Sequence, residues 1–450
     1  MQLDMTRGSI PSLLIRFTIP LLIGNIFQQL YNMVDTMIVG KYVGASALAA
    51  VGATGNLMFL ITGFSIGFAA GFSIITAQAF GAGDGWKLRH SVSNGILLSL
   101  LTAVILTTVS LTCMDTFLHW MNTPSDIYPQ ARSYITIIAA GLIANTFYNL
   151  LSGYLRAVGN SRAPLMFLIF SSVLNILLDL WFILSFHMGV KGAAMATVLS
   201  QAVSAVLCAV YIHFRVPDLI PRRNEWRLQR AISLSQLKMG IPMALQFAVT
   251  ASGMTIMQAA INAYGSTAVA AVTAASKLQY LLMQGVMATG QAMATFCGQN
   301  FGAGDRGRVT QGIRVALAGL AAYSIFAFIM LRFVFPHLLF LFFPGSEDLT
   351  SIGEYAGSYF RVTMCFYLPL SFILIFRNSL QGCGYALLPL FSGITELLAR
   401  CIMAALSGHT HRFLFAIACD PAAWCAAGLY TLLAYLFVRH QWKRQGVLDQ

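Results

Sequence analysis

The sequence predicts an all-α polytopic membrane protein, with twelve transmembrane helices in two pseudo-symmetric six-helix bundles. Hydrophobic residues make up 58% of the 450-residue chain and charged residues only 9%, whereas a soluble domain carries about 25% charged residues. The apolar residues fall in runs of the length that a membrane-spanning helix needs. A seven-residue motif also occurs twice, about half a chain apart, which predicts two copies of one unit.

Twelve apolar runs follow one another along the chain. They cover residues 12–39, 46–79, 88–112, 127–158, 162–186, 190–214, 232–264, 267–299, 309–333, 348–380, 385–407 and 413–438. Several are longer than the ~20 residues that a span needs, so we expect tilted helices or helices that extend beyond the bilayer. The first run is longer than the apolar core of a signal peptide and opens the repeat unit, so it is expected to remain in the protein.

The repeated motif relates the two halves. Residues 78–84 read Gln-Ala-Phe-Gly-Ala-Gly-Asp and residues 299–305 read Gln-Asn-Phe-Gly-Ala-Gly-Asp, identical at six of seven positions and offset by 305 − 84 = 221 residues. Ile19-Pro20 matches Ile241-Pro242 at an offset of 222 residues. Six spans per half is an even number, so both halves enter the bilayer in the same orientation. This arrangement implies a pseudo-two-fold axis along the membrane normal.

The net charge of +12 is distributed unevenly. In the twelve-helix prediction most basic residues fall on one side of the membrane, and the other side has only Lys41, Arg132, Lys191, Arg332 and Arg412 near its loops. The positive-inside rule then places both termini in the cytoplasm, with the chain as a multi-pass protein of the plasma membrane. This placement favours phospholipid headgroups, and not nucleic acid, as partners of the basic side.

A charged, proline-containing segment separates the two halves. Residues 216–231 form the predicted cytoplasmic linker between an N-terminal lobe, 1–215, and a C-terminal lobe, 232–450. A short amphipathic helix at the membrane interface is one interpretation of this segment. The composition favours a simple electrostatic tether.

The repeated Gly-Ala-Gly-Asp is predicted to be structural. Glycine allows a tight turn, and Asp84 and Asp305 can cap the helices that follow. The motif lacks the lysine and the strand context of a phosphate-binding loop. Pro20 and Pro242 occupy equivalent positions in the first span of each half and are expected to kink it. These kinks are either bending points or static features of packing.

A few acidic residues lie deep in apolar runs, where a charge costs about 2.5–3.5 kcal/mol on insertion scales. Gln28, Asn32 and Asp35 are spaced by four and three residues, and so share one helical face. Asn175 precedes Asp179 by four residues. A pair of carboxyl groups with amide neighbours suits the binding of a proton or a sodium ion. The alternatives are helix–helix hydrogen bonding and, for Asp35, a position near the outer headgroups.

The C-terminal half has different charges. Arg400 follows Glu396 by four residues, which favours an intrahelical ion pair of structural character. Asp420 stands beside Pro421 without an assigned role. Lys277 either directs its charge to the membrane surface, pairs with a carbonyl group, or lines a cavity of this half. No cofactor is expected, and the pair His409 and His411 is weak evidence for a metal site.

The chain resembles the multidrug and toxic compound extrusion (MATE) family of secondary transporters. The resemblance is carried by Ile19-Pro20, Tyr31-Asn32-Met33-Val34-Asp35-Thr36, the paired Gln-x-Phe-Gly-Ala-Gly-Asp, Leu155–Asn160, Asn175 with Asp179, and Pro421–Trp424. It implies proton- or sodium-driven export of amphipathic, usually cationic compounds by two six-helix lobes. The protein is expected to be a monomer.

The resemblance also implies roles for individual residues. Asp35, Asn175, Asp179 and Thr197 match the cation site that one branch of the family has in its N-terminal lobe. The residues expected to line the substrate cavity are Gln28, Asn32, Tyr134, Asn149, Gln246 and Lys277. Some members carry acidic residues in the seventh and tenth helices. Here the seventh has Gln246 instead, so coupling is expected to depend on the first lobe.

Three alternative functions fit the sequence less well. A lipid-linked oligosaccharide flippase would need several cations facing its cavity, and only Lys277 and Arg361 are candidates. A membrane-embedded enzyme would need clustered catalytic groups, and the few histidines lie near loops or helix ends. A channel would need a selectivity filter, and nothing in the sequence resembles one.

Overall fold

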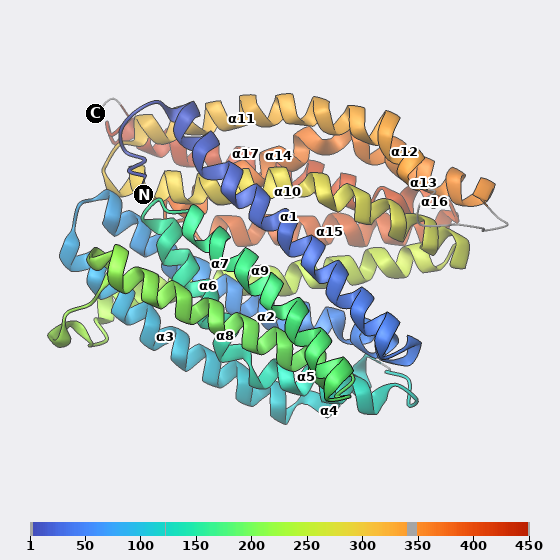
Figure 1. Ribbon diagram of the computed structural model, residues 1–450. Coiled ribbons are helices and arrows are strands. Elements are labelled where there is room, and N and C mark those ends of the chain that lie inside the picture. Colours follow the sequence, from blue (N-terminus) through green and yellow to red (C-terminus); the bar gives the residue numbers. More distant parts are fainter. Residues whose placement is uncertain (1–2, 122, 340–348, 449–450) are drawn as a thin grey trace. The chain divides into compact units, whose positions relative to one another are not determined.

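The computed structural model describes residues 3–121, 123–339 and 349–448. Within these ranges every regular element is helical, and no strand occurs (Figure 1). The prediction of an all-α membrane protein is therefore confirmed. The start of the predicted tenth span, residue 348, lies outside the described residues.

The first half of the chain contains the helices that correspond to the first six predicted spans. They are α1 (Ile10–Tyr42), α2 (Ala45–Gly81), α3 (Gly85–Thr112), the short α4 (Met114–Trp120), α5 (Tyr128–Ala140), α6 (Leu142–Ala157), α7 (Arg162–Leu180) and α8 (Val190–Arg215). A π-helical segment, Trp181–Ser185, extends α7. α5 and α6 are bent by 47° at Gly141 and together correspond to the fourth predicted span.

The second half repeats this pattern. Its helices are α9 (Arg230–Asn262), α10 (Ser266–Gly302), α11 (Arg306–Ile329), α12 (Phe335–Leu338), α13 (Leu349–Thr363), α14 (Tyr367–Gly382), α15 (Leu387–Thr410), α16 (Phe413–Ile417) and α17 (Cys419–Arg444). A π-helical segment, Met330–Val334, joins α11 to α12. A 3₁₀ turn, Met364–Phe366, joins α13 to α14.

The helices have the length and apolarity that a bilayer requires. Among the described residues, ten helices qualify as membrane spans, and the bent pair α5–α6 is an eleventh candidate. The predicted eighth span, α10, is not among these helices, although it has 37 residues. It carries Lys277 and several glutamines, which lower its mean hydropathy. Its length still exceeds the ~20 residues that a span needs.

The duplication is visible in the helix bounds and caps. α1 and α9 each contain 33 residues, and α2 and α10 each contain 37. Gly44 and Gly265 precede α2 and α10 with φ of 117° and 90°, a region that favours glycine. Asp84 and Asp305 each accept a hydrogen bond from the backbone N–H three residues later, at 2.9 and 2.6 Å. The predicted capping role of both aspartates is confirmed.

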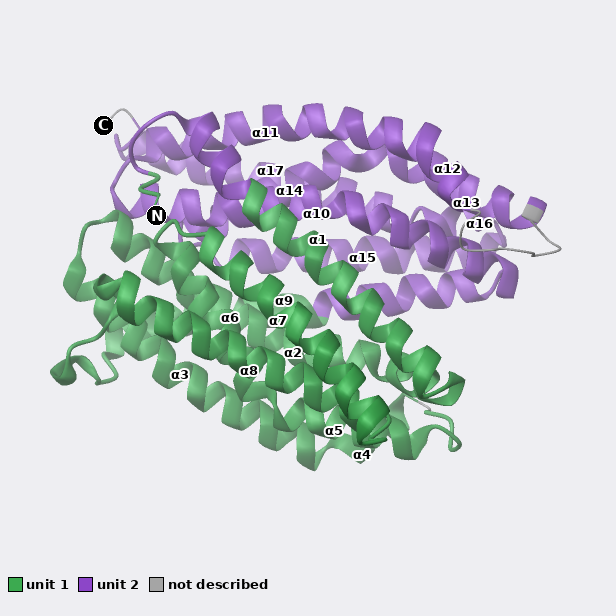
Figure 2. Ribbon diagram, viewed as in Figure 1, with its two compact units in different colours: residues 1–5, 19–248 green, residues 6–18, 249–450 purple. Residues whose placement is uncertain are grey.

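The chain forms two compact units, coloured separately in Figure 2. The first contains residues 3–5 and 19–248 of the described chain, and the second contains residues 6–18 and 249–448. α1 and α9 therefore each contribute residues to both units. The predicted lobe boundaries at residues 215 and 232 stay a prediction.

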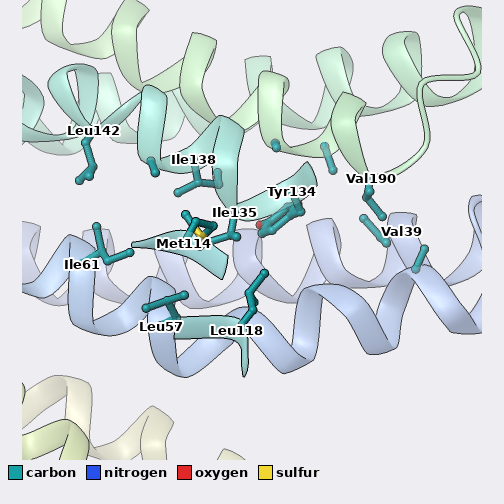
Figure 3. Close-up of a cluster of buried hydrophobic side chains, with 14 of the residues drawn as sticks. Val39, Leu57, Ile61, Met114, Leu118, Tyr134, Ile135, Ile138, Leu142 and Val190 are labelled. Atoms are coloured by element: carbon teal, nitrogen blue, oxygen red, sulfur yellow. The ribbon is translucent and has the colours of Figure 1, made fainter. Parts of the chain in front are cut away.

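Two large buried apolar clusters lie in the described part of the first unit. One joins side chains of α1, α2, α4, α5 and α8, among them Val39, Leu57, Ile61, Met114, Leu118, Tyr134, Ile135 and Val190 (Figure 3). The other contains Phe72 of α2, Leu88 and Val92 of α3, and Val216 and Leu219 from the segment after α8. That segment is therefore anchored in the core of the unit.

Small residues allow α2 and the first part of α9 to pack closely. Gly63, Gly67 and Gly71 are spaced by four residues on α2 and face α9. A Cβ atom on Gly71 would lie 2.5 Å from the Cα atom of Gly240. Such spacing of small residues is a common way for membrane helices to bring their backbones together.

Candidate functional site

Four polar residues predicted from the sequence meet inside the first unit. Asp35 comes from α1, Asn175 and Asp179 from α7, and Thr197 from α8. Asn175 and Asp179 are fully buried, and Thr197 is 4% exposed. With its nitrogen toward Asp179, the Asn175 amide donates to Asp179 Oδ2 at 3.0 Å and accepts from the Thr197 backbone N–H at 3.1 Å. Asn175 thus links α7 to α8 and fixes one oxygen of Asp179.

The two carboxyl groups in this cluster are close neighbours. The side chains of Asp35 and Asp179 lie within hydrogen-bonding reach of each other. Two ionised carboxylates repel each other at this range in a buried site, so the pair favours a shared proton or a cation between the oxygens. The Oδ1 atoms of both residues are buried and have no hydrogen-bond partner in the described part of the chain. These two oxygens are available to a proton or a small hard cation.

Two tyrosines complete the surroundings of the carboxyl pair. Tyr31 on α1 lies close to the Thr197 side chain and to both aspartates. Tyr134 on α5 also lies near both aspartates and is 3% exposed, inside the apolar cluster of Figure 3. Its position is thus beside the carboxyl pair. Tyr31 is not among the site residues predicted from the sequence, although its spacing of four residues from Asp35 places both on one helical face.

The other residues predicted to line a cavity are more dispersed. Gln28 and Asn32 are exposed on α1. Asn149 on α6 is half-buried and donates to the backbone and side-chain oxygens of Asn145 at 2.8 and 3.2 Å. Gln246 is half-buried on α9, in the first unit, and Lys277 is exposed on α10, in the second. Their role in substrate binding stays a prediction.

The second unit contains a chain of alternating charges. Arg377 on α14 pairs with Glu396 at 3.0 Å, Glu396 with Arg400 at 3.5 Å, and Arg400 with Asp420 at 2.9 Å. The predicted intrahelical pair of Glu396 and Arg400 is present, and the structure adds a partner at each end. All four side chains are at most 20% exposed. Because the charges cancel, this cluster suits cross-linking of α14, α15 and α17 better than cation binding.

Metal-binding side chains do not cluster in the described residues. No group of three or more histidine, cysteine, aspartate or glutamate side chains could hold a metal ion there. Any cation at the Asp35–Asp179 pair would therefore need ligands of other types, such as amide, hydroxyl and backbone oxygens, which Na⁺ accepts.

Known proteins resemble the chain over most of its length. The sequence model of the MatE family matches residues 20–181 and again 242–406, more than half of the chain. The probable multidrug resistance protein YpnP of Bacillus subtilis is 29% identical over 78% of this chain and 78% of its own. The probable multidrug resistance protein YoeA of Bacillus subtilis is 26% identical over 96% of this chain and 94% of its own.

The fold is also that of a solved structure. A crystal structure described as MATE in complex with MaL6 superposes with a TM-score of 0.91, at 23% sequence identity, over 98% of this chain and 99% of that one. One matched range of the family model lies within each half of the sequence.

Proposed function

The chain belongs to the multidrug and toxic compound extrusion (MATE) family of membrane transporters, and we propose that it exports amphipathic, cationic drug-like compounds in exchange for H⁺ or Na⁺. The observation that carries the proposal is the Asp35–Asp179 pair, with its two unpartnered buried oxygens. The names of the multidrug resistance relatives support the substrate class.

The proposed coupling follows from the charge of the pair. When a proton or Na⁺ binds, it neutralises repulsion between α1 and α7 and draws the two helices together at this point. When the cation leaves, the repulsion returns and α1 shifts relative to α7. Pro20 in α1 removes a backbone hydrogen bond and makes that helix easier to bend. In this mechanism Asn175 and Thr197 hold Asp179 in place, so that the movement falls on α1.

Transport requires that the cation and the substrate favour different states of the protein. A ligand shifts a conformational equilibrium only by its difference in affinity for the two states. Cation binding at Asp35 and Asp179 would stabilise the state that releases substrate, and by reciprocity substrate would weaken cation binding. We propose Gln28, Asn32, Tyr134, Asn149, Gln246 and Lys277 as the residues that line the substrate path.

The remaining parts of the proposal concern topology. Both termini would lie in the cytoplasm, because the basic residues concentrate on that side of the twelve spans. The lobes would be residues 1–215 and 232–450, joined by 216–231, in a monomer embedded among membrane lipids. No cofactor would take part beyond the coupling ion.

The test is efflux of a fluorescent cation from reconstituted vesicles, with pH and Na⁺ gradients imposed separately. We expect one gradient to drive efflux, and Asp35→Asn to abolish it while the protein still inserts into the membrane. The matched control is Asp115→Asn, since Asp115 is exposed and pairs with Arg132 outside the cluster, at 2.6 Å. Undiminished driven efflux by Asp35→Asn would refute the coupling role. Failure of the wild-type protein to move any of several unrelated cations would refute the multidrug proposal.

A further inference from the structure

The segment between α8 and α9, predicted to be an electrostatic tether, is folded against α3. Arg89 of α3 donates to both carboxylate oxygens of Glu225 at 3.0 Å. Glu225 also accepts from the Arg222 backbone N–H at 2.7 Å and is 5% exposed. Two short 3₁₀ turns, Pro217–Leu219 and Arg223–Glu225, shape the segment. We call residues 216–229 the docked linker.

A second set of contacts fixes the end of the docked linker. Asn94 of α3 donates to the Gln229 carbonyl oxygen at 3.1 Å and accepts from the Gln229 N–H at 3.2 Å. Asn94 also donates to Ser233 Oγ in the first turn of α9, at 3.1 Å. Since Val216 and Leu219 are buried at the other end, the docked linker is held along its length. Its side chains therefore have defined places on the surface of the first unit.

The outer side of this structure combines arginines with large aromatic and apolar side chains. Residues 214–230 expose five arginines, at positions 215, 222, 223, 227 and 230, against one exposed carboxylate, Asp218. Trp226 is 46% exposed and Leu228 is 57% exposed. The remaining acid, Glu225, is buried and neutralised by Arg89. Five exposed arginines therefore face a single exposed carboxylate, and the surface is strongly cationic.

The first turn of α3 extends the same surface. Trp86 is 53% exposed and stacks on His90, with the ring centroids 4.1 Å apart. Trp86 precedes Arg89, the ion-pair partner of Glu225, by three residues on α3, so the two side chains lie on the same side of that helix. Lys87 is exposed beside it. We call Trp86, Lys87, Arg222, Arg223, Trp226 and Arg227 the basic-aromatic surface.

We propose that the basic-aromatic surface binds the headgroups of anionic phospholipids in its folded arrangement. It lies at the end of α8 and the start of α3 and α9, where spanning helices leave the bilayer. Tryptophan is enriched at that depth, and basic side chains there attract anionic lipids. Arginine forms paired hydrogen bonds with phosphate oxygens. The proposal rests on the membrane location of the chain and is independent of the coupling ion and of the transported compound.

The test uses the full-length protein in neutral detergent, titrated with short-chain phosphatidylglycerol or phosphatidylcholine and followed by native mass spectrometry. We expect phosphatidylglycerol to bind more tightly. The triple change Arg222→Ala, Arg223→Ala and Arg227→Ala should weaken phosphatidylglycerol binding by roughly 5-fold for each arginine removed. The triple change to lysine keeps the charge but loses the paired hydrogen bonds, so it should weaken binding less than the alanine triple does. The control Arg439→Ala, Lys443→Ala and Arg444→Ala removes the same charge from α17 and should leave binding within about twofold.

Glu225→Gln distinguishes a folded site from simple charge attraction. This change adds one positive charge, so charge attraction alone predicts tighter binding of phosphatidylglycerol. If the arrangement of the docked linker matters, losing the Arg89–Glu225 contact should weaken binding, and backbone hydrogen exchange over residues 216–229 should rise.

Four results would overturn the proposal: tighter binding by Glu225→Gln, equal binding of phosphatidylcholine, unchanged binding by the alanine triple, or equally tight binding of glycerol phosphate. The last result would indicate a site for soluble anions. Because none of these measurements depends on efflux, failure here is distinguishable from failure of the antiport proposal.

Discussion

Gly67 of α2 packs so closely on α9 that a Cβ atom there would lie 2.5 Å from the Cα atom of Ala244. The nearest atoms belong to the α9 backbone, which cannot rotate away as a side chain can. The two helices would have to separate to admit even one methyl group.

Gly67→Ala is therefore expected to destabilise the first unit, by about 1–3 kcal/mol for overpacking. The measurement is the thermal unfolding midpoint in detergent. The control is Gly55→Ala on the same helix, where a Cβ would meet nothing within 4 Å and alanine should be neutral or slightly stabilising. Equal midpoints for the two variants would show that the helices can adjust at Gly67 without cost.

Asp179→Asn is expected to abolish gradient-driven efflux, because one carboxylate of the proposed pair is lost.

Tyr31→Phe removes only a hydroxyl group near the pair and should reduce the rate of efflux without abolishing it. The Asn149 side chain on α6 donates to the carbonyl oxygen of Asn145 on the same helix. Asn149→Ala should change the preference among substrates, while gradient-driven efflux persists. Initial rates with several dyes under one imposed gradient check all three. Full driven efflux by Asp179→Asn would contradict the assignment.

Arg400→Met is expected to destabilise the second unit more than Arg377→Met. Arg400 neutralises both Glu396 and Asp420, whereas Arg377 pairs with Glu396 alone. Removing one partner of a buried ion pair costs about 3–5 kcal/mol, because the other charge is left buried. Thermal unfolding in detergent checks the order of the two variants. A larger loss of thermal stability for Arg377→Met would show that Arg400 does not stabilise the buried charge of Asp420.

Docking of the linker is expected to fail only in acid. Burial alone would raise the pKa of Glu225, but the hydrogen bonds from the Arg222 backbone N–H and the Arg89 side chain outweigh it and lower the pKa. A lowered folded-state pKa means that this contribution to stability is complete above the ordinary glutamate pKa of about 4.3 and is lost as the pH falls through the folded-state value. Hydrogen exchange of residues 216–229, corrected for the intrinsic rate, should stay constant from neutral pH to about pH 5.

The Glu225→Gln variant is the control for that experiment. Its exchange over residues 216–229 should be fast already at neutral pH and should show no further acid step. Release of the linker in the wild-type protein near pH 6 would contradict the lowered pKa.

The sequence by itself determined the helices, the duplication and the polar faces of single helices. These depend on local chemistry: the length of an apolar run, glycines that allow a tight turn, the capping residues Asp84 and Asp305, and a spacing of four residues between Asn175 and Asp179. It also identified Glu396 with Arg400, because both lie on one helix.

Only the tertiary structure decided which helix faces meet. In a membrane protein the residues that face lipid and those that face another helix are both apolar, so periodicity does not identify the packed side. The approach of Asp35 to Asp179, the pairing of Arg400 with Asp420 and the docking of Glu225 on Arg89 all join residues that are distant in sequence. The same holds for Gly67 and Ala244, whose close approach depends on the relative placement of two whole helices.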